Sequence, residues 1–94
     1  MFSYKDHRWL RKRRAILKRD SYLCQEDRRY GKSTPATTVH HIYPVEQYPQ
    51  YAFSDWNLIS LSGRQHNEMH DRITNQLTAK GVALMERVSP PGTK

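Results

Sequence analysis

Large aliphatic side chains are scarce in this sequence, and their scarcity limits the size of any core that it can form. Leucine, isoleucine, valine and phenylalanine account for 17 of the 94 residues, or about 18%. So low a fraction, with a net charge of +7, is more typical of disordered chains than of large folded ones. Six tyrosines and two tryptophans supply further apolar surface. We therefore expect one small domain with a polar centre that a metal ion could close.

The positive charge is concentrated in the first third of the chain. Residues 1–32 contain eleven Lys or Arg side chains and four acidic ones, so they carry the whole net charge, while residues 33–94 are neutral. A concentrated positive field most often meets nucleic-acid phosphate. An anionic membrane surface is the competing partner, but this segment has few large apolar residues to insert into it. A helix face that only confers solubility is the third interpretation.

Several other classes are excluded by pattern. No apolar run approaches the roughly 18 residues needed to cross a bilayer, and charged residues occupy the N-terminal positions where a signal peptide would be apolar. We therefore expect no membrane partner and a cytoplasmic location. Cys24 is the single cysteine, so it can form no disulfide within the chain and cannot alone build a thiolate zinc site.

Periodicity and turn residues predict an α+β order of elements within a single domain, residues 1–94. Ser3 and Thr78 are the expected N-caps of the first and last helices. The predicted elements are a basic helix over 5–19, a strand over 37–42, a returning strand over 56–61 and helices over 64–73 and 78–88, with loops over 25–35 and 45–55 and a loose tail over 89–94.

Four of the five histidines fall within a window of 31 residues. Adjacent residues on a strand point to opposite faces, so His40 and His41 are expected to have different roles. On a helix, His66 and His70 would project from one face, which is the geometry of two-histidine helical metal sites. A third ligand from a neighbouring strand would complete a site with an open coordination position, as catalytic metal sites have.

These residues resemble the HNH endonuclease motif of the ββα-metal nucleases, in the small stand-alone form common in phages. The motif residues are His40-His41-Ile42, Asn57, His66-Asn67 and His70. There are 16 positions from His41 to Asn57, 9 from Asn57 to His66 and 4 from His66 to His70, close to the pattern of colicin-type nuclease domains. The resemblance runs from about residue 4 to residue 88 and implies a two-stranded hairpin with a long loop, followed by a metal-binding helix.

The resemblance implies a metal-dependent DNA endonuclease or nickase that hydrolyses phosphodiester bonds. It assigns His41 as the general base and Asn57 as the residue whose side-chain amide ties the long loop and so orients that base. It assigns His40, His66 and His70 as the ligands of one divalent ion. Three imidazoles favour zinc, nickel or manganese in affinity, whereas cellular abundance favours magnesium, so the ion stays open. No small-molecule cofactor is implied.

DNA is the implied substrate, and basic side chains are the candidates to hold its phosphates. Those candidates are Arg11, Arg13, Arg14, Lys18, Arg28, Arg29 and Arg64. Small phage members of the family often act with the terminase in genome packaging. Terminase is therefore an expected partner, with the host cytoplasm as the location if a phage encodes the chain.

The sequence departs from the family at one point. Many phage members carry a structural zinc on two Cys-x-x-Cys pairs, and the matching positions here are Cys24, Asp27, Ser62 and Gln65. Three of the four thiolates are absent. One thiolate with serine and glutamine cannot supply the soft four-ligand cage that structural zinc needs, so we expect no structural zinc.

Two alternatives stay beside the nuclease hypothesis. One is a catalytically silent DNA-binding module on the same scaffold, against which His41 argues, because binding alone gains nothing from a base beside a metal. The other is a bacteriocin-like nuclease toxin domain, suggested by the double histidine. Such a toxin usually carries translocation regions, which these 94 residues do not contain.

Overall fold

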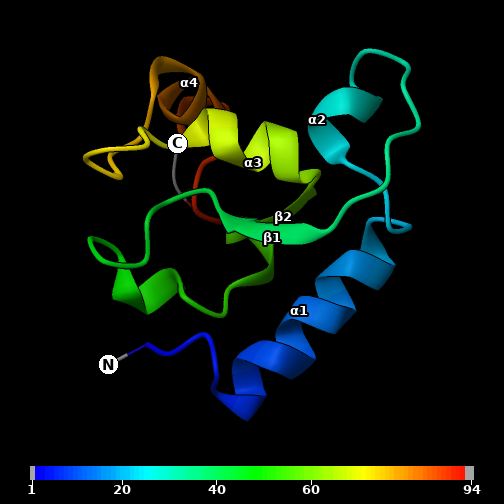
Figure 1. The fold of residues 1–94 in the computed structure, drawn as a ribbon. Helices are drawn as coiled ribbons and strands as arrows, with labels where there is room; N and C mark the ends of the chain where they lie inside the picture. Colours follow the sequence, from blue (N-terminus) through cyan, green and yellow to red (C-terminus); the bar gives the residue numbers. More distant parts are fainter. Residues whose placement is uncertain (1, 93–94) are drawn as a thin grey trace.

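The computed structural model describes residues 2–92 and has an α+β architecture built on a two-stranded antiparallel sheet (Figure 1). Helix α1 packs against one face of that sheet, and α3 with α4 covers the other face. The elements are α1 (His7–Arg19), α2 (Gln25–Arg28), β1 (Thr38–His41), the 3-10 helices η1 (Pro49–Tyr51) and η2 (Asp55–Asn57), β2 (Leu58–Leu61), α3 (Gly63–Met69) and α4 (Ala79–Arg87). The predicted fold class is confirmed.

The register of the sheet divides the molecule into two sides. His40 pairs with Ile59 and His41 pairs with Leu58. Because strand side chains alternate, adjacent residues face different helices. The buried apolar residues form one cluster on the α1 side, Trp9, Ile16, Leu17, Val39 and Leu58, and another on the side of α3 and α4, Cys24, Ile42, Leu61, Met69 and Leu84.

Helix α1 begins at His7, two residues later than predicted, because Asp6 and not Ser3 is its N-cap. The Asp6 carboxylate accepts a hydrogen bond from the amide of Arg8 over 2.7 Å. A carboxylate suits this position, since it satisfies a free amide and opposes the positive end of the helix dipole. The helix buries three of the apolar positions seen in the sequence, Trp9, Ile16 and Leu17.

A buried carboxylate, Asp20, joins the end of α1 to the sheet. It accepts hydrogen bonds from the Ser60 amide over 3.0 Å and from the Arg19 guanidinium over 2.8 and 3.0 Å. Arg19 also donates to the carbonyl oxygens of Asp55, at 2.8 Å, and Leu58, at 2.7 Å. An unpaired buried carboxylate would be costly. These contacts therefore hold α1 against β2.

Three further elements in the first two thirds of the chain differ from the sequence prediction. Residues 25–28 form α2 inside the predicted loop, because a four-residue helix is too short to show periodicity. The returning strand begins at Leu58 and not at Trp56, since residues 55–57 form η2. The first strand is one residue shorter at each end than predicted.

The predicted helix over 64–73 is wrong in its second half. Helix α3 spans Gly63–Met69, and His70 has extended backbone with φ −125° and ψ 143°. The physical reason is that the chain after α3 pairs with the chain entering α4, through a β-bridge between His70 and Leu77. His66 and His70 therefore do not share a helical face.

Helix α4 matches the predicted helix over 78–88 to within a residue at each end, and Thr78 is its N-cap as expected. The Thr78 hydroxyl accepts a hydrogen bond from the Gly81 amide over 3.2 Å. Residues 89–92 form no helix or strand, and residues 93–94 of the predicted tail lie outside the described residues. No helix within residues 2–92 is long and apolar enough to cross a membrane.

Close contact between α4 and the end of α3 gives a prediction about stability. A Cβ atom added at Gly81 would lie 2.5 Å from the Met69 carbonyl oxygen and 2.9 Å from Leu77 Cδ2. We expect Gly81→Ala to lower the free energy of unfolding by about 1–3 kcal/mol, because the backbone of α3 must move.

Urea denaturation measures this effect, with Gly63→Ala as the matched control. A Cβ atom at Gly63 would meet only the Thr37 hydroxyl oxygen, at 3.9 Å. Gly63→Ala should therefore be neutral or stabilising by up to about 1 kcal/mol. Equal stability of Gly81→Ala and wild type would contradict the close packing of these helices.

Candidate metal centre

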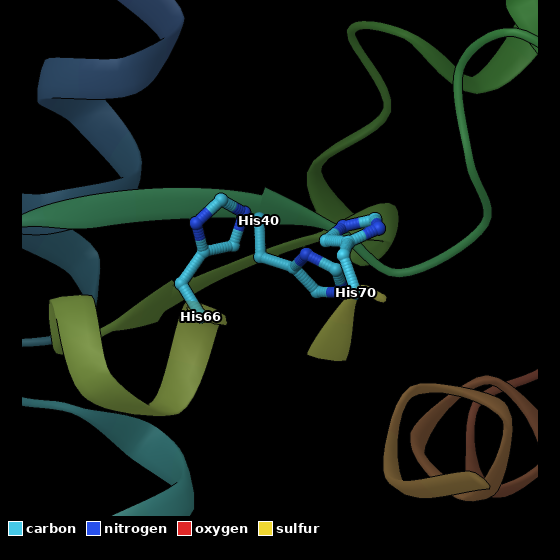
Figure 2. Close-up of side chains that lie close together, drawn as sticks. All are labelled: His40, His66 and His70. Atoms are coloured by element: carbon cyan, nitrogen blue, oxygen red, sulfur yellow. The ribbon is translucent and has the colours of Figure 1, made fainter. Parts of the chain in front are cut away.

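Three histidine side chains come together beside the sheet. His40 lies on β1, His66 on α3 and His70 directly after α3, with ring centroids 5.2–5.5 Å apart. One nitrogen atom of each ring lies within 4.8 Å of those of the other two. Figure 2 shows the three rings gathered together, each carried by a different segment. The structure thus brings together the three residues expected to bind a metal, although not from one helical face.

His40 gives the strongest indication that this cluster binds a metal ion. Its side chain is 1% exposed, and both ring nitrogens are buried without a hydrogen-bond partner among residues 2–92. Buried polar atoms nearly always have a partner, and a neutral imidazole can obtain one by binding a cation. Three imidazoles around one point, open on one side to a cleft, fit a divalent ion that keeps a position for substrate.

Burial keeps the cluster in the protonation state that binds metals. Burial, and then the neighbouring His66 and His70, lower the pKa of His40 from 6.5 to about 3. Burial also lowers the pKa of His66, and His70 adds to that shift. Both rings are therefore neutral at pH 7, with a nitrogen lone pair available to a cation. The Nδ1 atom of His70 lies 3.4 Å from the Asn75 carbonyl oxygen, so a proton on Nδ1 leaves Nε2 free.

His41 points toward the other side of the sheet, where its ring is held by several contacts. It stacks on Trp9 with 4.8 Å between ring centroids and 21° between the planes, and Phe2 meets it edge-on at 5.2 Å. Its Nε2 atom lies 3.0 Å from the Ala52 carbonyl oxygen. Because a carbonyl oxygen only accepts, Nε2 must carry the proton, and Nδ1 is the acceptor of the neutral ring. Burial lowers the pKa of His41, and the Ala52 hydrogen bond partly opposes that shift.

The two sets of histidines line a single cleft. The cleft has a volume of about 720 Å³ and includes His40 and His41 together with His66 and His70. Arg13 of α1 also lines it and brings a positive charge to its wall. A metal-ligand cluster, a proton acceptor and a guanidinium therefore share one space that is open to solvent.

Asn57 holds the loop between the two strands in place. Its side chain is completely buried; Oδ1 accepts from the Tyr43 amide over 2.7 Å, and Nδ2 donates to the carbonyl oxygens of Tyr43, at 3.1 Å, and Tyr51, at 3.2 Å. Tyr51 precedes Ala52, whose carbonyl oxygen contacts His41. Asn57 thus fixes the backbone that orients the His41 ring and does not itself line the cleft.

The contacts around His41 could hardly be predicted from the sequence. The aromatic ring of Trp9 is the one signal in the sequence that could have suggested stacking on an imidazole. The Ala52 carbonyl belongs to the backbone, so no residue type could have revealed it.

The seven basic residues expected to hold DNA are spread over three helices. Arg13 lines the cleft, and its Nη2 donates to the Thr37 carbonyl oxygen over 2.9 Å. The other six do not line the cleft within the part of the chain that the structure describes. Arg11, Arg14 and Lys18 are exposed on the side of α1 that faces away from the sheet.

The remaining three lie on α2, at its end and on α3. Arg28 is exposed. Arg29 donates to the buried carboxylate of Glu26 over 2.9 Å, and Arg64 pairs with Glu68 over 3.3 Å. The guanidinium groups of Arg29 and Arg64 are therefore directed to carboxylates of the protein itself.

Hydrogen bonds join the positions that match the zinc ligands of other family members. Gln65 Nε2 donates to Asp27 Oδ1 over 2.6 Å, and the Ser62 hydroxyl accepts from the Gln65 amide over 3.2 Å. Hydrogen bonds from Thr34 and Gln65 lower the pKa of Asp27. Cys24 is a free, fully buried thiol in an apolar cluster. These contacts tie α2 to the start of α3.

The fold is similar to that of a solved nuclease. The crystal structure of the HNH endonuclease of the deep-sea thermophilic bacteriophage GVE2, with manganese ion, matches with a TM-score of 0.67. The two sequences are 38% identical, over 68% of this chain and 70% of that one. No protein-family model and no curated protein matches the chain. The fold and the histidine cluster together define the class of protein, a small metal-dependent nuclease. The chain belongs to the HNH endonuclease family.

Metal binding by the cluster should be visible as a gain in thermal stability. With manganese at about 100 times its dissociation constant, we expect stabilisation of roughly 2.7 kcal/mol, or a rise in Tm of about 14 °C for a domain of this size. His66→Ala should lose most of that rise, because one of three ligands is removed. Differential scanning fluorimetry with and without EDTA measures it.

His7→Ala is the matched control, since His7 is exposed on α1 and belongs to no cluster of possible metal ligands in the described residues. It should keep the full rise in Tm. A rise that survives His66→Ala and His70→Ala alike would contradict the assignment of these ligands.

Proposed function

We propose that this protein is a metal-dependent DNA endonuclease in which His41 is the general base and His40, His66 and His70 hold one divalent ion. One observation carries the proposal: two adjacent histidines of β1 line the same cleft, one within a ligand cluster and the other fixed as a proton acceptor. Hydrolysis of a phosphodiester needs both a base to activate water and a cation to neutralise developing charge.

The surroundings of His41 suit proton transfer. The Nε2–H group of His41 donates a hydrogen bond to the Ala52 carbonyl oxygen. Nδ1 can therefore accept a proton from a water molecule in the cleft. The lowered pKa keeps the ring neutral, and hence able to accept, at pH 7. The imidazolium that forms keeps its hydrogen bond to Ala52, which stabilises the new charge. Stacking on Trp9 prevents the ring from turning away. Asn57 acts here as a positioning residue, through the backbone next to Ala52.

The three-histidine cluster would supply the cation. When bound, the ion would polarise the phosphate and stabilise the departing 3′ oxygen. Three imidazoles suit manganese, zinc or nickel better than magnesium. The related phage endonuclease was solved with manganese, which makes manganese the first ion to test here.

The substrate that fits the charge of the molecule is DNA. The net charge of +7 attracts a polyanion to the surface, and Arg13 places a guanidinium in the cleft beside the histidines. Among the described residues there is one ligand cluster for each chain. One encounter should therefore cut one strand, so nicked circles should precede linear DNA. Clean cleavage of both strands would need a second copy of this chain or a partner protein. We infer that a phage terminase is that partner.

Replacement of the base should separate cutting from binding. We expect His41→Ala to slow conversion of supercoiled plasmid by about 10²–10⁴-fold with manganese, while gel-shift affinity for the same DNA stays close to that of wild type. His7→Ala should cut normally, and EDTA should stop all cutting. Wild type that shifts DNA but never cuts it with manganese, magnesium, nickel or zinc would contradict the proposal.

Two arginines on α1 provide a test of which charges contact the substrate in the cleft. Arg13 lines the cleft and Arg14, its neighbour in sequence, is exposed on the helix. We expect Arg13→Ala to lower kcat/KM by about 10²-fold, as removal of a preorganised donor does, and Arg14→Ala to lower it less than tenfold. Steady-state cleavage of a labelled duplex measures both. Equal losses of kcat/KM in the two variants would show that the arginines act only through the net charge of the protein, and would contradict a specific contact by Arg13.

A further inference from the structure

The segment after α3 forms a short loop, residues 71–76, whose ends are held together beside the histidine cluster. The β-bridge between His70 and Leu77 closes the loop at its base. Just above that bridge, the Asp71 amide donates to the Gln76 carbonyl oxygen over 2.7 Å. The loop is therefore anchored at the residue that carries one of the three clustered imidazoles.

The tip of this loop is fixed from within and presents an isoleucine to solvent. The Asp71 carboxylate accepts hydrogen bonds from the amides of Ile73, over 2.8 Å, and Thr74, over 2.9 Å. The Ile73 side chain is 95% exposed, more than any other large hydrophobic residue in the described chain; Tyr30 follows at 70%. Isoleucine is among the residues most often buried, and in this protein such residues are scarce.

Residues of the loop line two hollows that both include members of the histidine cluster. Thr74 and Asn75 line the 720 Å³ cleft that holds His41. A second hollow, of about 520 Å³, is lined by His66, Asn67, His70, Asp71, Arg72 and Asn75. A duplex whose phosphate sits at the cluster therefore lies beside this loop.

Chain geometry limits how far the tip can be from the reacting phosphate. Ile73 is three positions after His70, so their Cα atoms are at most about 11 Å apart. Successive phosphates of one DNA strand are about 3.4 Å apart along the helix axis. The backbone of Ile73 is thus within the length of about three base pairs of the backbone of His70, one of the three clustered histidines.

We propose that Ile73 is a DNA-contacting residue that enters a groove of the bound duplex beside the cut site and partly unstacks one base step. The inference rests on the proposed function and adds the substrate contact that distorts the duplex there. Exposed apolar side chains held on a rigid support are used in this way to wedge base steps from the minor groove.

The chemistry of the loop favours DNA over a protein as the occupant. Arg72 precedes the isoleucine and is in no ion pair within residues 2–92, so it can meet a phosphate. Asp71, the one acid of the loop, has its carboxylate engaged by backbone amides. One isoleucine among polar residues is also far smaller than the roughly 800 Å² that each partner contributes to a stable protein interface.

The test uses a duplex carrying 2-aminopurine, a base whose fluorescence rises when it is unstacked, next to a cut site mapped with the wild-type enzyme. The protein is the His41→Ala variant, so the DNA stays intact. We expect fluorescence to rise several-fold on binding, and the additional change Ile73→Ala to remove that rise and weaken binding by about tenfold. Ile73→Leu should restore both.

Leu10→Ala is the matched control, because Leu10 is an exposed aliphatic residue on α1, 37% exposed; it should leave the signal unchanged. Unaltered fluorescence and affinity with Ile73→Ala would overturn the inference while cleavage by wild type stands. A change in oligomeric state by light scattering, with an unaltered DNA response, would overturn it in favour of a contact between copies. Wild type that cuts no DNA would remove the proposed function and this inference together.

Discussion

The structure depends most on the antiparallel pairing of β1 with β2. A shift of one residue in a strand exchanges its two faces. Such a shift would move His40 into the apolar cluster around Trp9 and His41 into the ligand cluster. Contacts at both ends of the pair oppose it: Asp20 accepts from the Ser60 amide, and the Ile42 amide donates to the carbonyl of residue 57. The division of labour between the two histidines therefore follows from the strand register.

A chain with so few aliphatic residues obtains much of its order from buried polar contacts. Asp20, Glu26 and Asn57 are each less than 8% exposed, and all three accept hydrogen bonds from neighbouring groups. The Glu26 carboxylate forms ion pairs with Arg29, at 2.9 Å, and Arg87, at 3.2 Å, and so links α2 with α4. Satisfied buried networks of this kind specify a single arrangement, since each unmade bond would be costly. They position the site in a chain that has a single cysteine.

Much of the fold could be predicted because its signals are local. The β-branched run before His40, the first basic helix and the Thr78 cap each depend on a few neighbouring residues, and all three lie close to where the sequence put them. The grouping of His40, His66 and His70 was predicted as well, although by the wrong geometry. The sequence suggested a shared helix face for the last two, whereas a β-bridge to Leu77 ends the helix before His70.

What could not be predicted depends on contacts between distant segments. The expected DNA-binding residues were chosen by their charge, but the sequence does not show that Arg29 and Arg64 pair with carboxylates of the protein itself. The His41 ring is kept in place by stacking on Trp9 of α1 and by the backbone carbonyl of Ala52 in the loop between the strands. Periodicity marks Trp9 only as an apolar helix position, and a backbone carbonyl has no signal in the sequence. The folded chain is therefore needed to show which ring nitrogen of His41 meets a carbonyl oxygen.

Anomalous diffraction from crystals grown with manganese tests the metal centre most directly, because it locates the ion without reference to activity. We predict one strong peak at about 2 Å from a nitrogen of each of His40, His66 and His70, on the side that opens to the cleft shared with His41. A map without a peak at these rings, or with the ion held by carboxylates elsewhere, would contradict a nuclease centre built on the three histidines.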